Sequence, residues 1–123
     1  MARKQQIGAA GEEAAARFLA RHGLRILHRN LRLGRAGELD IVALERTTLV
    51  LVEVKARLAS ETLGGFGNIT PTKQRKLYEL GQAYLQRYPG NYTAVRLDAI
   101  EVVFPDETLK RPQLNHLPDA FHL

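Results

Sequence analysis

Three acidic residues and a lysine stand close together in two neighbouring stretches of the chain. Glu38 and Asp40 occur in residues 37–41, and Glu53 and Lys55 follow in a valine-rich run. Because side chains in a β-strand alternate between two faces, Glu53 and Lys55 share one face and the neighbouring valines take the other. Carboxylates beside a lysine suit a site that binds a divalent cation and hydrolyses phosphodiester bonds.

The two stretches are predicted to pair as an antiparallel hairpin. Residues 38–44 and 49–57 have strand composition, and the turn falls within residues 45–48. If the hairpin is centred between Arg46 and Thr47, the numbers of directly opposed residues sum to 93. This register decides which charged side chains lie next to one another.

In this register Asp40 faces Glu53, and Glu38 faces Lys55. Opposed residues have Cβ atoms roughly 4.5–5.5 Å apart, so the four groups form one patch. Two facing carboxylates repel unless a cation bridges them. Mg²⁺ or Mn²⁺ is the expected bridge, because these ions prefer oxygen ligands, and the chain has no cysteine.

The competing interpretation is a surface hairpin with ordinary ion pairs between its strands. These pairs would join Glu38 to Lys55 and Asp40 to Arg57. The valine-rich strand around Glu53 indicates a central position in the sheet, which favours the catalytic interpretation. A shift of one residue in the register would remove the predicted geometry.

The other elements must hold this hairpin in place. A helix over residues 7–21, stopped by Gly23, precedes a strand over residues 24–33 and a turn over residues 34–37. Residues 58–69 are glycine-rich and are expected to form a mobile loop that closes over a substrate.

A second helix begins with Thr70 as its N-cap and Pro71 as its first residue, and it ends before Pro89. Strands are predicted over residues 92–104 and 113–117. The order of the elements indicates a single α/β or α+β domain, residues 1–123, with a central mixed sheet flanked by helices.

Composition limits the partners and the compartment. Net charge is +5, arginines outnumber lysines 13 to 5, and the first 35 residues carry a net +6. Arginine suits bidentate contact with phosphate, so nucleic acid is the expected partner. The chain shows no apolar run of membrane-spanning length and no signal peptide, so we expect a cytoplasmic protein without membrane contact.

These motifs resemble the YraN-like family of uncharacterised bacterial proteins, within the restriction-endonuclease-like PD-(D/E)xK nuclease superfamily. The resemblance spans nearly the whole chain. The residues that carry it are 11–15, 29–32, 37–41, 52–57, 73–76 and 96–98.

The resemblance implies a metal-dependent nuclease fold similar to that of archaeal Holliday-junction resolvases. It places Asp40, Glu53 and Lys55 in the signature positions and brings Glu12 in from the first helix. One departure is that Leu39, and not proline, precedes Asp40.

We therefore predict the following site. The catalytic residues are Asp40, Glu53, Lys55, Glu12 and Glu38, of which Asp40, Glu53 and Glu12 are the metal ligands. The predicted nucleic-acid contacts are Arg57, Lys73, Lys76, Asn30, Arg32 and Arg35.

Two further groups of polar residues are not assigned to the site. Arg96 and Asp98 share a strand face and are expected to form a structural ion pair. His28, His116 and His122 lack metal-ligand spacing, and we assign them no role.

Three functions are consistent with the sequence. The first is a Mg²⁺- or Mn²⁺-dependent endonuclease that acts on DNA, including branched or junction DNA, as a homodimer. The second is a non-catalytic nucleic-acid-binding module that retains the nuclease fold. The third is a basic interaction protein without a nucleic-acid role.

Overall fold

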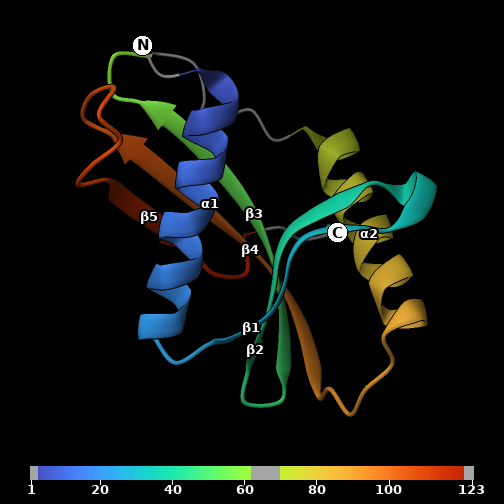
Figure 1. Ribbon diagram of the computed structural model, residues 1–123. Helices are drawn as coiled ribbons and strands as arrows, with labels where there is room; N and C mark the ends of the chain where they lie inside the picture. Colours follow the sequence, from blue (N-terminus) through green and yellow to red (C-terminus); the bar gives the residue numbers. More distant parts are fainter. Residues whose placement is uncertain (1–2, 62–69, 121–123) are drawn as a thin grey trace.

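The described residues form a five-stranded sheet between two helices (Figure 1). The computed structural model describes residues 3–61 and 70–120. The helices are α1 (Lys4–Arg21) and α2 (Pro71–Arg87), with a short 3-10 turn, η1 (Gly34–Ala36). The strands are β1 (Arg25–Arg32), β2 (Glu38–Glu45), β3 (Thr48–Leu58), β4 (Ala94–Phe104) and β5 (Gln113–Leu117). The predicted α+β class is confirmed.

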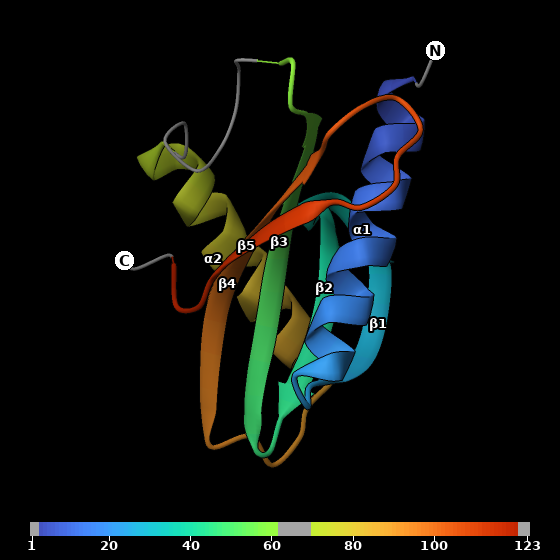
Figure 2. The ribbon, with the colours of Figure 1, turned by 90° about the vertical axis from the view of Figure 1, so that its left-hand side faces the viewer.

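The sheet is mixed, and its strands follow one another in the order β1-β2-β3-β4-β5 (Figure 2). Strands β3 and β4 are parallel, and every other neighbouring pair is antiparallel. Parallel neighbours need a long crossover, which α2 provides between β3 and β4. This topology places β3, the strand that carries Glu53 and Lys55, at the centre of the sheet.

Each helix covers one face of the sheet and completes a separate hydrophobic core (Figure 1). Val50 and Val52 lie in the core beneath α1, whereas Leu49 and Leu51 lie in the core beneath α2. The predicted alternation of β3 is therefore confirmed. Buried residues of the helices complete these cores: Ile7, Ala15, Ala16 and Leu19 from α1, and Leu77, Leu80 and Tyr84 from α2.

The boundaries of α1 were predicted only in part. The helix begins at Lys4 and not at Ile7, because the Gln6 side chain accepts a hydrogen bond from the Arg3 N–H at 2.8 Å and so caps the first turn. Its end is as predicted, with Gly23 in the left-handed region at φ +88°. Neither helix of the described part is long and apolar enough to cross a membrane.

The start of β4 differs from the prediction, and the predicted loop is described only in part. Strand β4 begins at Ala94 and not at Tyr92, because the preceding Thr93 donates its N–H to the Thr47 carbonyl in the β2–β3 turn at 2.9 Å. Most of the predicted closing loop, residues 62–69, lies outside the described residues.

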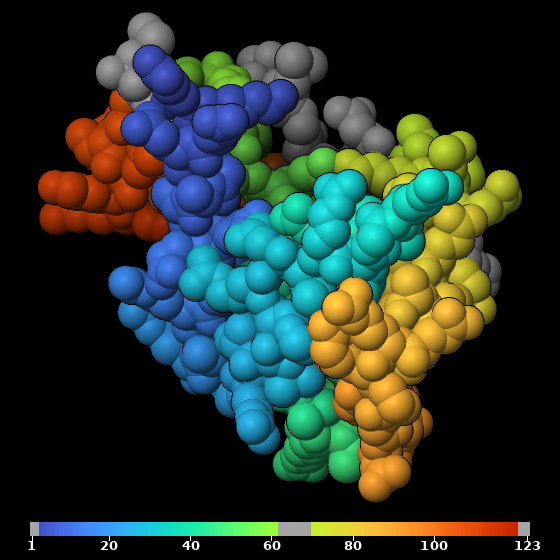
Figure 3. Space-filling model, turned by 45° about the vertical axis from the view of Figure 1, so that its right-hand side comes forward, coloured from blue at the N-terminus to red at the C-terminus, as the bar shows by residue number. Residues whose placement is uncertain are grey.

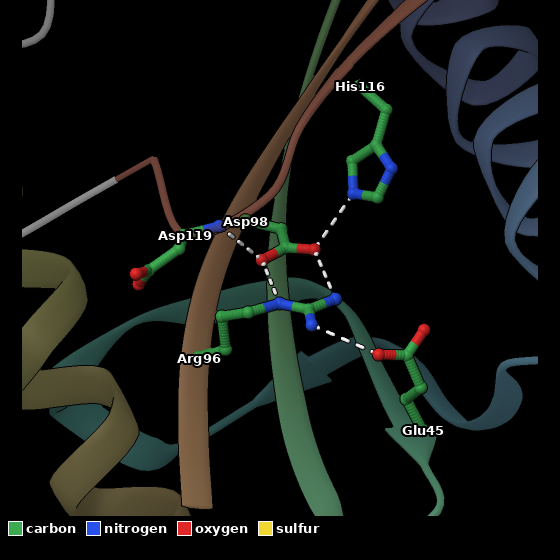
Figure 4. A network of polar contacts seen from close by, with 5 residues as sticks. All are labelled: Glu45, Arg96, Asp98, His116 and Asp119. Carbon is green, nitrogen blue, oxygen red and sulfur yellow. Dashed lines mark hydrogen bonds and ion pairs between the residues drawn. The ribbon is translucent and has the colours of Figure 1, made fainter.

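A buried ion-pair network fastens β4 to its surroundings (Figure 4). The Asp98 side chain is 0% exposed and accepts two hydrogen bonds from Arg96, at 2.8 and 3.0 Å. His116 on β5 lies 2.8 Å from the same carboxylate, the Asp119 N–H donates to it, and Arg96 also reaches Glu45 on β2. The predicted structural pair is confirmed, and His116 has a structural contact that the sequence did not indicate.

Gly11 sets the distance between α1 and the sheet. A Cβ atom added at Gly11 would overlap the Cβ of Ala56 on β3 and lie 3.8 Å from that of Val102. The absence of a side chain therefore lets the helix backbone lie directly on the central strand. The next residue along the helix is Glu12, so this contact also positions a predicted ligand.

Gly11→Ala is expected to destabilise the fold by about 1–3 kcal/mol, because the added methyl group forces α1 away from Ala56. Gly8→Ala is the matched control, since a Cβ there meets nothing within 4 Å. It should leave stability unchanged or raise it by up to about 1 kcal/mol through helix propensity. Urea unfolding measures both, and equal stabilities of the two variants would refute the close contact.

Candidate active site

The β2–β3 hairpin pairs in the predicted register only as far as Ile41 and Val52. Its turn is at Arg46, as predicted, where the backbone takes φ +55°. Beyond Ile41 the Val54 N–H has no β2 carbonyl opposite it, and it donates to the Asp40 carboxylate at 2.8 Å. The Asp40 side chain thus replaces a strand-to-strand backbone bond.

This ending changes two details of the predicted patch. Asp40 and Glu53 are not a ladder pair, because pairing stops one residue earlier. Glu38 pairs with Arg32 on β1 and does not lie opposite Lys55 in the β2–β3 ladder. The predicted hairpin register was right from the turn to Ile41 and Val52. The predicted backbone pairs Asp40–Glu53 and Glu38–Lys55 were wrong, because the strands are no longer paired there.

On the β1 side, Asn30 and Asp40 stand between the paired positions Arg29–Ile41 and Leu31–Leu39, and the register is unchanged across them. Asn30 adopts φ +50°, a left-handed conformation that asparagine tolerates better than most residues. Its side-chain amide acts on Glu12 of α1 and opposes the rise in the pKa of that carboxyl group.

Four carboxylates act on one another at this point. Burial, and then the negative charges of Glu53, Glu12 and Glu38, raise the pKa of Asp40 to about 7, against the opposing hydrogen bond from Val54. Burial and the charge of Glu38 also raise the pKa of Glu12, although Asn30 partly opposes this. The structure therefore brings all four predicted acidic residues into one electrostatic group.

Two lysines face the same carboxylate. The Nζ atoms of Lys55 and Lys73 lie 3.8 and 4.0 Å from Oε1 of Glu53. Contact with Lys55, followed by burial, lowers the pKa of Lys73. Lys73 comes from the first turn of α2, where Thr70 is the N-cap as predicted and accepts a hydrogen bond from the Lys73 N–H.

The ion pairs of a simple surface hairpin do not form among the described residues. Lys55 is next to Glu53 and not Glu38. Arg57 lies 3.3 Å from Glu101 on β4 and donates to the Glu61 carbonyl at 2.9 Å. Arg57, a predicted nucleic-acid contact, is therefore already held by the protein.

The donor atoms of the site fit a hard divalent cation. Within residues 3–61 and 70–120, no three acidic or histidine side chains converge as a preformed metal cluster. Mg²⁺ needs fewer, since it binds through one or two carboxylates and keeps several waters. Asp40 and Glu53 supply two carboxylates. Burial, and then the neighbouring carboxylates, raise the pKa of Asp40, and a bound cation would stabilise the charged form against both.

Three of the other predicted nucleic-acid contacts lie on the protein surface. Arg32, Arg35 and Lys76 are exposed, and Gly37 next to η1 packs against Lys76 and Leu80 of α2. In Figure 3 the end of β3 (green) reaches the surface between α1 (blue), the η1 segment (cyan) and the start of α2 (olive). Of the predicted nucleic-acid contacts, Lys73 lies beside a carboxylate of the site, and Lys76 lies beside Gly37.

Comparison with known proteins places this fold in a family. The model of the uncharacterised protein family UPF0102 matches residues 11–102. The UPF0102 protein of Chlorobium phaeobacteroides strain BS1 is 37% identical over 118 residues, which cover 94% of this chain and 93% of that protein. The chain belongs to the UPF0102 family.

Other UPF0102 proteins come from different bacteria. That of Mycolicibacterium vanbaalenii is 41% identical over 99 residues, which cover 80% of this chain and 81% of the relative. That of Geobacter metallireducens is 37% identical over 123 residues, which cover 97% of this chain and 94% of the relative. The UPF0102 match includes every predicted catalytic residue, from Glu12 to Lys55.

For this UPF0102 protein, Asp40→Asn is expected to raise stability above neutral pH when EDTA removes divalent cations. The pKa of Asp40 rises from 3.8 to about 7 on folding. The folded protein therefore keeps a proton that the unfolded chain has lost, and this stabilisation is present in full below pH 3.8 and disappears as pH rises through about 7. An asparagine suffers no such loss.

Urea unfolding at acidic, neutral and mildly alkaline pH measures the difference. Asp40→Asn should exceed the wild type by at least about 1 kcal/mol at roughly pH 8 and by little near pH 4. Glu107→Gln, which removes an exposed carboxylate, is the charge-matched control and should show no such trend. A stability difference between the wild type and Asp40→Asn that stays constant across this pH range would contradict the strained carboxylate group.

Proposed function

We propose that this UPF0102 protein is a Mg²⁺- or Mn²⁺-dependent endonuclease that hydrolyses DNA phosphodiester bonds, with branched or junction DNA as the substrate class. The observation that carries the proposal is the meeting of Asp40, Glu53 and Lys55 where the β2–β3 pairing ends. The proposal includes membership of the restriction-endonuclease-like PD-(D/E)xK superfamily, a kinship to Holliday-junction resolvases and a cytoplasmic location.

Each side chain has a role that its position supports. Asp40 and Glu53 would hold the cation, with Glu12 contributing from α1 and Glu38 adding negative charge at the start of β2. When bound, the metal ion supplies a Lewis acid for the phosphate and a water of lowered pKa. Lys55 orients the attacking water and offsets the negative charge that grows on the phosphate oxygens.

In the hydrolysis itself, a water oxygen forms a new bond to phosphorus while the bond to the leaving sugar oxygen breaks. The water gives up a proton, and the leaving oxygen takes one from solvent. The hydrogen bond from Val54 fixes the Asp40 carboxylate before substrate arrives, so little reorganisation is needed at the moment of reaction.

The DNA part of the proposal rests on charge. Net charge is +5, and Lys73 and Asn30 act on carboxylates of the acidic group, while Arg32, Arg35 and Lys76 are exposed on β1, η1 and α2. The positive charge of the arginines and lysines would hold the phosphate backbone over the carboxylates. Binding of this kind weakens as salt rises, because phosphate contacts release counterions.

A non-catalytic nucleic-acid-binding module is the second candidate. The observation that favours it is that two lysines already neutralise Glu53. In such a module the carboxylates would be structural, and DNA would bind without being cut. Metal-dependent cleavage distinguishes the two candidates.

The expected result is cleavage of single-stranded, flap or four-way-junction DNA that requires Mg²⁺ or Mn²⁺ and stops in EDTA. Asp40→Asn and Glu53→Gln should each lower kcat by about a hundredfold or more, because each removes a charged ligand without changing side-chain size. Both variants keep the shape of the site, so their DNA affinity in low salt should remain close to that of the wild type.

The controls separate the candidates. Equal residual cleavage by the wild type and both variants would indicate a contaminating nuclease. Binding of DNA without cleavage under either metal would support the non-catalytic module. Absence of DNA binding even at low salt would contradict both and favour the basic interaction protein.

A resolvase that cuts two strands needs two active sites, so the proposal includes a homodimer. Light scattering at the concentration used for cleavage should give about twice the chain mass of 13.8 kDa. A monomer that cuts both strands of a junction at equal rates would contradict this part of the proposal.

A further inference from the structure

Two ammonium groups approach one carboxylate oxygen in the candidate site. Lys55 reaches Oε1 of Glu53 from the same strand, and Lys73 reaches it from α2, at 3.8 and 4.0 Å. Glu53 is only 19% exposed, and the two lysine side chains are 37% and 36% exposed. Neither lysine makes a hydrogen bond to Glu53 among the described contacts. Both distances are longer than a hydrogen bond, so the contacts of Glu53 with the two ammonium groups are ion pairs without close hydrogen-bond geometry.

This arrangement has an electrostatic cost that a bound anion would lower. The two ammonium groups approach the same carboxylate oxygen and repel each other, and the charges of Glu53 and Asp40 offset only part of this repulsion. Lys73 also stands in the first turn of α2, which contains no acidic residue. The helix dipole disfavours a cation at this end of a helix. A phosphate group between the lysines would remove both penalties at once.

The position of the two lysines also fits the metal ligands. Glu53 is a proposed ligand, and Asp40 acts electrostatically on Lys73. A phosphate that touches both ammonium groups would therefore lie beside the cation held by these carboxylates. Lys76, one turn further along α2, is turned towards Gly37 and η1 and is more distant from this point.

We propose that Lys73 is a second catalytic cation, which contacts the scissile phosphate together with Lys55. The inference rests on the proposed nuclease activity and changes the role of Lys73 from general DNA binding to charge stabilisation during bond cleavage. Lys76, Arg32 and Arg35 keep the role of holding the DNA backbone.

Steady-state cleavage by Lys73→Gln, Lys73→Arg and Arg75→Gln tests this role. Lys73→Gln should lower kcat by about 10²–10³-fold with KM little changed, as expected for a charge that acts in the transition state. Lys73→Arg keeps the charge and should retain activity within about tenfold of the wild type. Arg75→Gln removes an exposed charge from the same helix and should leave both constants unchanged.

A binding measurement supplies a readout that does not depend on cleavage. Loss of the Lys73 charge next to Glu53 should tighten Mn²⁺ binding severalfold, as followed by electron paramagnetic resonance, whereas Arg75→Gln should not. Thermal unfolding confirms that Lys73→Gln and Arg75→Gln are equally folded.

The outcomes separate this inference from the proposed function. If the wild type cleaves DNA and Lys73→Gln keeps the kcat of Arg75→Gln, the inference is wrong and the nuclease proposal stands. A raised KM with unchanged kcat would return Lys73 to general DNA binding. If the wild type binds Mn²⁺ but cleaves no DNA substrate, the nuclease proposal fails, and the role of Lys73 fails with it.

Discussion

The hydrogen bond from the Val54 N–H to Asp40 is the contact on which the candidate site depends. It exists because the β2–β3 ladder ends at Ile41 and Val52, which leaves a backbone donor on the central strand without a partner. A part-buried donor of this kind needs an acceptor, and a side-chain carboxylate provides it here. The same bond holds Asp40 where the charges of Glu53, Glu12 and Glu38 act on it, so the acidic group forms at the end of the strand pairing.

The acidic group is held together against its own repulsion. Burial and neighbouring carboxylates raise the pKa of Asp40, while two lysines approach Glu53 and repel each other. Folding elsewhere must compensate for this cost. The two hydrophobic cores and the Asp98 network supply stability elsewhere, and within residues 3–61 and 70–120 no buried side-chain nitrogen or oxygen lacks a hydrogen-bond partner. Unfavourable interactions that are concentrated at one site and compensated elsewhere in the fold are common where a site is prepared for a ligand.

Strand pattern and turn position were sufficient to predict much of this arrangement. The valine alternation of β3 and the turn at Arg46 fixed the hairpin register, and Thr70 with Pro71 marked the start of α2. The hydrogen bond from the Val54 N–H to the Asp40 side chain could not be predicted in this way. Strand alternation assigns a side chain to one face of the sheet and does not show that it will bond to the backbone of the next strand. The contact of Lys73 with Glu53 was also missed, since it depends on how α2 packs on the sheet.

The match to UPF0102 confirms the family part of the resemblance, and the matched residues 11–102 include Glu12, Lys73 and the hairpin of β2 and β3. It does not by itself assign a reaction. The most direct test is a crystal structure of the protein soaked with Mn²⁺, with anomalous diffraction used to locate the ion. The account predicts a peak coordinated by Asp40 and Glu53. Well-ordered Asp40 and Glu53 side chains with no manganese between them, at a concentration that saturates binding in solution, would contradict it.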